Sequence, residues 1–215
     1  MKVVIGIATT GDRDEYLEKT LESLRNQDTE LDVSIRVYDN SHVFCEDYTD
    51  NAKFYFLAQE TKPVYYFSCD DDIIYPSDYV SKTVKAIEEH QCIVSYHGRI
   101  LRGLDVSYYH GHTALACKHN FPQTLELDVV GTGVTAWKTS FFNPVDIYKA
   151  EDKCMSDLVF SLEATKQGKK IMHIGHPAKW IVPQDLPKGT TIYEQHHRKC
   201  ERQTEIANEI WLLKN

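Results

Sequence analysis

Three consecutive aspartates, Asp70, Asp71 and Asp72, are the residues of this 215-residue chain whose type and spacing most directly indicate chemistry. They follow an apolar and aromatic run, residues 64–69, which predicts a buried β-strand. Carboxylates that follow such a strand lie at the sheet edge where open α/β proteins bind their ligands. Because carboxylate oxygens suit Mg²⁺ and Mn²⁺, the pattern predicts a divalent-cation site that carries a phosphate.

Other interpretations of the triplet are a solvated acidic turn and a helix cap, since Pro76 suits the first turn of a following helix. A calcium loop of the EF-hand type does not fit. Residues 72–76 supply neither the alternating aspartates nor the glycine and later glutamate that such a loop needs. The preceding strand favours the metal site.

The elements that must position the triplet alternate along residues 1–97. The apolar patterns predict strands at 3–8, 33–38, 64–69 and 93–96, and helices at 16–26, 46–59 and 79–87. Parallel strands need crossover connections, and helices usually supply them. The sequence therefore predicts an α/β fold with a mainly parallel central sheet and helices on both faces.

The second half of the chain has a different pattern, which predicts a smaller α+β extension built over the edge of the sheet. Short strands are expected at 106–110, 125–130, 134–137 and 170–174, with a helix at 155–166 that Gly168 closes. Prolines then mark a long irregular segment from 177, which we interpret as a lid, before a helical tail at 193–213. We expect one domain, 1–215, with parts 1–97, 98–176 and 177–215.

Composition sets limits on location and partners. With 42% hydrophobic and 26% charged residues, the chain has the composition of a soluble globular protein. A formal charge of -8 argues against nucleic acid as a partner. No secretion signal and no stretch of about 20 apolar residues is visible, so we expect a cytoplasmic location, with peripheral membrane contact left open. The six cysteines form no CxxC pair, which favours free thiols.

The ends of the first three predicted strands together resemble a known family. Thr9-Thr10-Gly11-Asp12-Arg13, Asp39-Asn40-Ser41 and Asp70-Asp71-Asp72 look like the nucleotide-sugar half of a GT-A glycosyltransferase, close to the family 2 type. Gly131-Thr132-Gly133 resembles the acceptor-side segment of that family, and residues 161–168 resemble its helix ending in lysine, a variable residue and glycine. The resemblance covers most of residues 1–176 and implies a Rossmann-like GT-A fold.

The resemblance also implies an activity and roles for single residues. It implies transfer of a hexosyl group from a nucleotide-diphosphate sugar to a hydroxyl acceptor, which could be a glycan or a lipid-linked saccharide. UDP is favoured because the family uses it most. The implied contacts with the nucleotide sugar are Thr9, Thr10, Arg13, Asp39, Asp70 and Asp71, and the implied ligands of Mn²⁺ or Mg²⁺ are Asp72, Asp70 and His176.

The family register places Asp157 as the base that takes the proton of the acceptor hydroxyl in an inverting displacement. Members commonly carry an acid just before this aspartate, whereas this chain has Ser156, so a displaced register stays open. Retention of configuration stays open as well. Each of these residues also has an ordinary structural interpretation: Asp39 as a turn former, Arg13 as a surface cation and Asp157 as a solvated helix residue.

Two other functions remain. A sugar-phosphate nucleotidyltransferase of similar architecture would usually have a glycine-rich loop with Arg and Lys after the first strand, and residues 9–13 contain one glycine. A non-catalytic nucleotide- or carbohydrate-binding module is the third function. His173 is expected to be structural, and the roles of His196, His197, Trp180 and Tyr193 are open.

Overall fold

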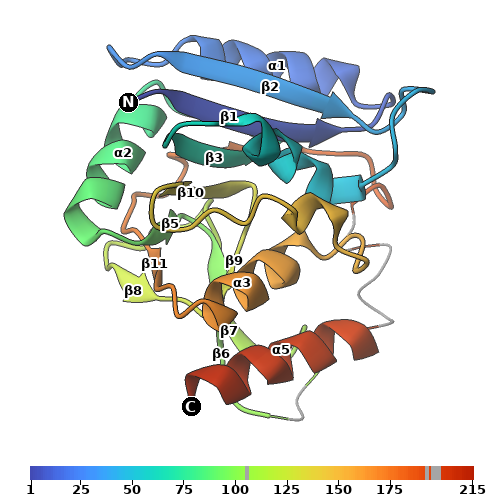
Figure 1. Ribbon diagram of the computed structural model, residues 1–215, viewed down its shortest axis with the longest axis vertical. Coiled ribbons are helices and arrows are strands. Elements are labelled where there is room, and N and C mark those ends of the chain that lie inside the picture. Colours follow the sequence, from blue (N-terminus) through green and yellow to red (C-terminus); the bar gives the residue numbers. More distant parts are fainter. Residues whose placement is uncertain (105–106, 192–193, 195–199) are drawn as a thin grey trace.

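The computed structural model describes residues 1–104, 107–191, 194 and 200–215, and it is built around a seven-stranded sheet (Figure 1). From one edge to the other the strands are β2 (Val33–Asp39), β1 (Val3–Thr9), β3 (Tyr65–Asp70), β10 (Val134–Lys138), β5 (Ile93–Ser95), β11 (Ile171–His173) and β8 (Leu125–Glu126). Only β10 and β8 run against the direction that the other strands of this sheet share. The predicted α/β class and mainly parallel sheet are confirmed.

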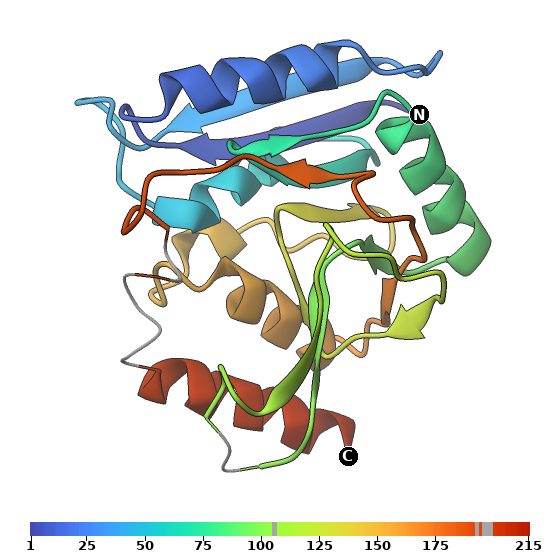
Figure 2. The same cartoon turned by 180° about the vertical axis from the view of Figure 1, so that it is seen from behind.

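Helices cover both faces of the sheet, as the alternation predicted (Figures 1 and 2). Along β1, Val3, Ile5 and Ile7 face one core, with residues of α1 (Asp14–Arg25) and α2 (Tyr79–His90). Val4 faces the other, with residues of η1 (Thr49–Gln59) and α3 (Ser156–Lys166). Successive side chains of a strand point to opposite faces, and burial of each large aliphatic side chain contributes about 1.5–3 kcal/mol.

The strand predicted at 134–137 does not lie at the edge of the sheet. It is β10, and it pairs in antiparallel fashion with both β3 and β5 in the middle of the sheet. Val134, Ala136 and Trp137 are all buried, on both faces of the strand. A central strand that is covered on both faces has a continuous apolar sequence. Such a sequence does not predict which strands pair with it. This insertion brings the residues just before β10 next to the end of β3.

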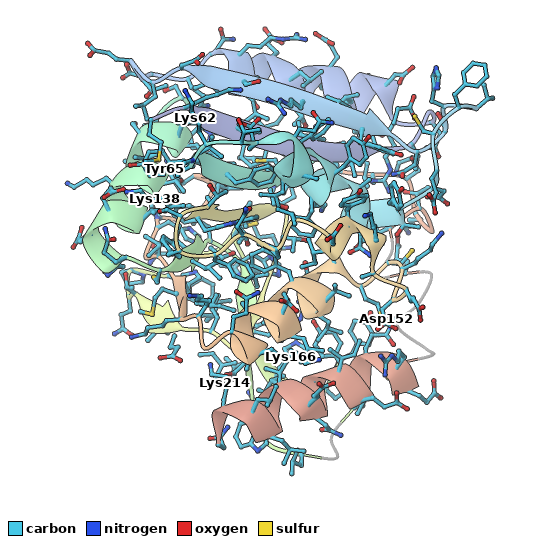
Figure 3. All side chains as sticks on the ribbon, in the orientation of Figure 1. Lys62, Tyr65, Lys138, Asp152, Lys166 and Lys214 are labelled. Atoms are coloured by element: carbon cyan, nitrogen blue, oxygen red, sulfur yellow. The ribbon has the colours of Figure 1, made fainter. Side chains whose placement is uncertain are left out.

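A third core lies beyond α3, where α5 (Glu201–Lys214) packs against α3 and a small sheet of β7 (His112–Leu115), β6 (Gly98–Leu101) and β9 (Val129–Val130). Salt bridges tie α5 to the rest: Lys166 pairs with Glu209 at 2.9 Å and Asp152 with Arg202 at 2.8 Å, and Figure 3 labels the first residue of each pair. None of the helices among the described residues combines the length and apolar character needed to cross a membrane.

Several predicted elements of the second half differ from the structure. Residues 108–110 form a turn rather than a strand, while Val106 lies outside the described residues. The run 125–130 is divided between two sheets as β8 and β9, because residues 127–128 leave the first sheet. The helical tail is described from Glu201 as α5, and residues 192–193 and 195–199 are outside the description. A short helix, η2 (Ile147–Lys149), was not predicted.

The segment expected to act as a lid is partly held by the fold. Its strand β12 (Val182–Pro183) pairs with β4 (Ile73–Ile74), directly after the aspartate triplet. The Gln184 amide donates to the Asp72 carbonyl oxygen at 2.8 Å, and the Trp180 indole donates to the Asp78 carboxylate at 2.7 Å. The segment therefore braces the loop that carries the aspartates.

The helix predicted at 46–59 is present from Thr49, as the 3₁₀-helix η1 rather than an α-helix. It packs closely on β1, where Gly6 leaves room for its backbone. A Cβ atom at Gly6 would lie 2.1 Å from the Lys53 carbonyl oxygen and 2.4 Å from the Tyr66 hydroxyl. That hydroxyl donates to the same Lys53 carbonyl at 2.7 Å. Gly6 thus fixes how near Lys53 approaches the sheet.

We expect Gly6→Ala to lower the free energy of unfolding by about 1–3 kcal/mol, because the added methyl group overpacks a contact with backbone. The measurement is chemical denaturation followed by circular dichroism. Gly11→Ala is the matched control, since a Cβ there would meet only the side chain of Ser41 in an exposed turn and no backbone atom. Equal stability of the two variants would contradict the packing role of Gly6.

Candidate functional site

A cleft of about 540 Å³ opens where β1 and β3 end, at the carboxyl edge of the sheet. Its walls come from the loop after β1, the aspartate triplet, the start of η1, the 131–133 segment, the first turn of α3, and residues of β6 and α5. The volume lies within the range of small-molecule sites. Segments far apart in the sequence therefore converge on the edge that the triplet predicted.

Asp71 braces the first loop of the cleft. Its buried carboxylate accepts a hydrogen bond from the Thr9 hydroxyl at 2.7 Å and pairs with the Arg13 guanidinium at 3.1 Å. Burial raises the pKa of Asp71, although Thr9 and Arg13 act in the opposite direction. Asp71 was expected to contact the nucleotide sugar, and in the structure both of its oxygens bind protein groups. It can support a ligand by holding Thr9 and Arg13.

Among the carboxylates that line the cleft, Asp72 has the pKa that departs most from its ordinary value. Burial, with the charges of Asp70 and Asp71 beside it, raises the pKa of Asp72 to about 7. The Arg13 guanidinium lies 3.7 Å away, too far for a hydrogen bond. Since the ionised form is disfavoured there, a cation that entered the cleft would relieve the charge of Asp72. A carboxylate with such a raised pKa in a cleft marks a candidate functional site.

Lys53 is a site residue that the sequence analysis missed. Its side chain is 5% exposed, and its ammonium group pairs with the Asp70 carboxylate and lies 3.5 Å from the Thr132 hydroxyl. Burial alone would lower the pKa of Lys53, but the charges of Asp70, Asp50 and Asp157 raise it, so the lysine is a permanent cation. A sequence signal existed, because Lys53 stands between the apolar residues Ala52 and Phe54.

The 131–133 segment closes against Asp70 because β10 lies beside β3. A Cβ at Gly133 would lie 2.0 Å from Asp70 Oδ2. The Tyr75 hydroxyl donates to the Gly133 carbonyl at 2.6 Å and accepts from the Asp70 amide at 3.0 Å. Glycine is therefore required at 133, and the predicted acceptor-side segment lies directly against the predicted nucleotide-sugar segment.

Asp157 lies in the first turn of α3 and faces the cleft. Its Oδ1 accepts from the amide and the hydroxyl of Thr132, each at 2.8 Å, and its Oδ2 pairs with Arg99 at 3.2 Å. Burial opposes ionisation, but Arg99 and Thr132 outweigh it and lower the pKa of Asp157. Asp157 is thus an oriented, ionised carboxylate in the same cleft as Asp70 and Asp72.

The other predicted nucleotide contacts divide into two groups. Thr9, Thr10 and Arg13 line the cleft, and Arg13 also donates to the Thr190 carbonyl at 3.0 Å. Asp39 is not among the lining residues of the described chain; its carboxylate accepts from the amide and hydroxyl of Ser41 at 2.8 and 2.6 Å. Its neighbour Asn40 lines the cleft instead. The contacts of Asp39 are therefore those of a turn-forming residue.

His176, expected as a third metal ligand, is not brought to the aspartates. Its ring nitrogens lie 3.1 and 3.2 Å from the carbonyl oxygens of Pro177 and Tyr96, and it lines a different hollow beside α2. The strand exit that it follows, after β11, lies far from β3 across the sheet. His173 is fully buried, as expected of a structural residue. Tyr193, His196 and His197 lie outside the described residues.

The donor set of the cleft fits a cation that shares its coordination with a ligand. No cluster of three His, Cys, Asp or Glu side chains suited to an ion exists among the residues described, so an all-protein metal cage does not fit. Mg²⁺ is usually held by one or two carboxylates together with substrate phosphates. Asp70 and Asp72 both line the cleft and can supply such a pair.

Comparison with solved structures identifies the fold. TarS of S. aureus, residues 1–349 in complex with UDP, matches over 83% of this chain and 59% of its own, with 17% identity and a TM-score of 0.57. Full TarS matches over 87% of this chain and 37% of its own, with 15% identity and a TM-score of 0.58. The chain has a GT-A-like fold. It spans less than two thirds of each TarS chain.

The GT-A-like fold agrees with the resemblance that the strand-end motifs carry. No protein-family profile and no curated protein matches the sequence. At this low identity the likeness concerns the arrangement of the elements. The roles of individual residues therefore depend on the geometry of the cleft.

We expect Asp72→Asn to raise the free energy of unfolding at pH 8 by on the order of 2 kcal/mol in chelator-treated buffer, because it removes a charge that the folded state disfavours. The folded pKa of Asp72, about 7, lies above its ordinary value of 3.8. Its ionisation therefore costs stability as pH rises through this range. The gain from the substitution should shrink below pH 7 and vanish below about pH 4, where the carboxyl is protonated in both states.

Urea denaturation at a series of pH values measures this effect. Asp28→Asn is the control, because Asp28 is exposed and lies outside the residues that line the cleft. A variant at Asp72 that is less stable than the wild type at pH 8 would contradict the account of this carboxylate.

Proposed function

We propose that this chain is a metal-dependent glycosyltransferase that moves a sugar from a nucleotide-diphosphate sugar to a hydroxyl acceptor. The observation that carries the proposal is one cleft that holds the carboxylates of Asp70 and Asp72, the latter with a raised pKa, together with the oriented, ionised carboxylate of Asp157. Asp70 and Asp72 suit the binding of a cation together with a diphosphate, and Asp157 suits the removal of a proton. Residues 1–97 would bind the donor and residues 98–176 the acceptor.

The donor would bind at the loop after β1. Arg13 lines the cleft with its guanidinium held by Asp71, and it can contact a diphosphate oxygen from that position. Lys53 lies between Asp70 and Thr132, where its charge would offset a diphosphate at the same edge. A divalent ion at Asp70 and Asp72 would, when bound, neutralise the charge of the departing nucleotide.

The proposed reaction is a direct displacement. The acceptor oxygen forms a bond with the anomeric carbon as the bond between that carbon and the phosphate oxygen breaks, and the electron pair leaves with the nucleoside diphosphate. Asp157 takes the hydroxyl proton. Thr132 and Arg99 orient both of its oxygens, so the base needs little rearrangement before it acts.

UDP is the nucleotide we propose for the donor. TarS, which shares the fold, was solved in complex with UDP. The family that the strand-end motifs resemble also uses UDP most. The acceptor would be a glycan, a lipid-linked saccharide or another hydroxyl compound.

We expect the wild-type protein to release UDP steadily from a UDP-sugar in the presence of Mn²⁺ and an acceptor, and Asp72→Ala to abolish the release, because the variant loses a carboxylate of the cation site. A coupled assay for UDP over a panel of UDP-sugars measures this. Asp28→Ala is the control and should retain full release, since Asp28 lies outside the cleft lining of the described chain.

Equal rates for Asp72→Ala and the wild type would exclude Asp72 as a ligand of the metal ion. Binding of UDP-sugars without turnover on any acceptor would favour a binding module over an enzyme. Release of pyrophosphate from a sugar phosphate and a nucleoside triphosphate would instead identify a nucleotidyltransferase.

We expect Asp157→Asn to lower the transfer rate by about 10²–10⁴-fold, the contribution of a positioned general base, while donor affinity changes little. The amide can still accept from Thr132 but cannot take a proton. Single-turnover transfer together with calorimetric titration of UDP separates the two effects. Near-normal turnover by this variant would exclude Asp157 as the base.

A further inference from the structure

Lys53 places a positive charge of the protein beside Asp70, one of the two carboxylates proposed to bind the cation. Its ammonium group pairs with Oδ1 of Asp70 and lies 3.5 Å from the Thr132 hydroxyl. Oδ2 of Asp70 lies against Gly133, where an added Cβ would be 2.0 Å away. One oxygen of Asp70 is thus already engaged by a cation of the protein, and the other faces backbone.

Both the backbone and the surroundings of Lys53 hold its ammonium group at this position. The Tyr66 hydroxyl donates to the Lys53 carbonyl at 2.7 Å, and Gly6 leaves room for this carbonyl beside β1. The Lys53 side chain is 5% exposed, so the ammonium group is largely removed from water. A buried charge is costly unless it is paired. Lys53 therefore needs an anionic partner in every state of the cleft, and Asp70 is the partner with which it forms an ion pair in the described chain.

Asp72 lacks a partner of this kind. Its carboxylate lies 3.7 Å from the Arg13 guanidinium, too far for a hydrogen bond, and it forms no other ion pair within the described part of the chain. Its side chain is 24% exposed and lines the cleft. The two carboxylates therefore differ. Asp72 is free to bind a divalent cation, whereas Asp70 can bind one only in competition with Lys53.

We propose that Lys53 is a resident counter-ion of the cation site, which makes the binding of a divalent cation depend on the nucleoside diphosphate. The inference rests on the proposed function and specifies how its two ligands are coupled. A divalent cation at Asp70 draws on the negative charge that balances Lys53, and the two positive charges also repel each other. Without a further anion the buried ammonium group would lose its compensation, so the divalent cation alone binds weakly.

A diphosphate in the same cleft removes this conflict. Lys53 lines the cleft together with Asp70 and Asp72, where the diphosphate is proposed to bind. The phosphate oxygens supply the anionic partner that Lys53 requires, and Asp70 is then available to the divalent cation. The coupling is reciprocal, because a ligand that raises the affinity for a second ligand gains the same factor from it. Lys53 thus links the binding of two ligands, and this effect is measurable without turnover.

The test is a titration of the whole protein with Mn²⁺, with and without UDP, in which EPR spectroscopy measures the free ion. We expect Lys53→Met to bind Mn²⁺ alone about tenfold more tightly than the wild type, within the range of about 5–150-fold that is common for coupled sites. UDP should then raise the Mn²⁺ affinity of this variant by a smaller factor than that of the wild type. Lys166→Met is the matched control, because it also removes one positive charge that pairs with a carboxylate, Glu209, and it lies at the end of α3 away from Asp157.

The same titrations separate the two possible failures. If the wild type binds Mn²⁺ and UDP together but Lys53→Met binds Mn²⁺ alone no more tightly than the wild type does, the role of Lys53 is overturned and the proposed function stays intact. Wild-type protein that binds Mn²⁺ as tightly without UDP as with it would also overturn the coupling. Failure of the wild type to bind UDP, with or without Mn²⁺, would count against the proposed function and the inference together. If Lys53→Met does not fold, Lys53→Gln removes the charge and keeps a polar amide, and an unchanged Mn²⁺ affinity of that variant is equally a contradiction.

Discussion

The negative charge of three adjacent aspartates at the end of β3, of which Asp71 is buried, is the constraint on which the rest of the cleft depends. Arg13 and Lys53 are the cations that the described residues bring within 4 Å of the triplet. Each also joins the triplet to another element, since Arg13 bonds the Thr190 carbonyl and Lys53 belongs to η1. Burial, together with the charges of Asp70 and Asp71, raises the pKa of Asp72 even though both cations act in the opposite direction. Under the proposed function, a divalent cation would offset this charge when it binds.

Hydrogen bonds from other elements also fix the backbone around the triplet. The Thr20 hydroxyl of α1 donates to the carbonyls of Asp71 and Ile73, each at 2.9 Å, and Gln184 donates to the carbonyl of Asp72. On the other side β10 brings Gly133 against Asp70, and Thr132 then holds Asp157. The central strand β10 therefore links the acidic edge to the proposed base, and this coupling depends on its antiparallel insertion between β3 and β5.

Local patterns predicted much of the fold. The strands that end at Thr9, Asp39 and Asp70 and the helices between them follow from apolar periodicity, and the position of Asp70, Asp71 and Asp72 at the carboxyl edge follows from the strand before them. The order of the strands in the sheet could not be predicted, because an apolar sequence such as that of β10 does not distinguish a central strand from an edge strand. His176 was misplaced for a related reason: its distance from β3 depends on that order. The apolar neighbours of Lys53 could have indicated its burial, but its pairing with Asp70 depends on how η1 packs on the sheet, which no local pattern predicts.

The central claim is that a nucleoside diphosphate and a divalent cation bind this cleft together, and the melting temperature tests it most directly. A ligand at a hundredfold excess over its dissociation constant stabilises the folded state by about 2.7 kcal/mol, which corresponds to about 5–10 °C for a chain of this size. We predict a rise of this order with UDP and Mn²⁺ together, and a much smaller rise with UDP alone or Mn²⁺ alone. A combined effect no larger than that of the separate ligands, for UDP and equally for GDP, would contradict the account.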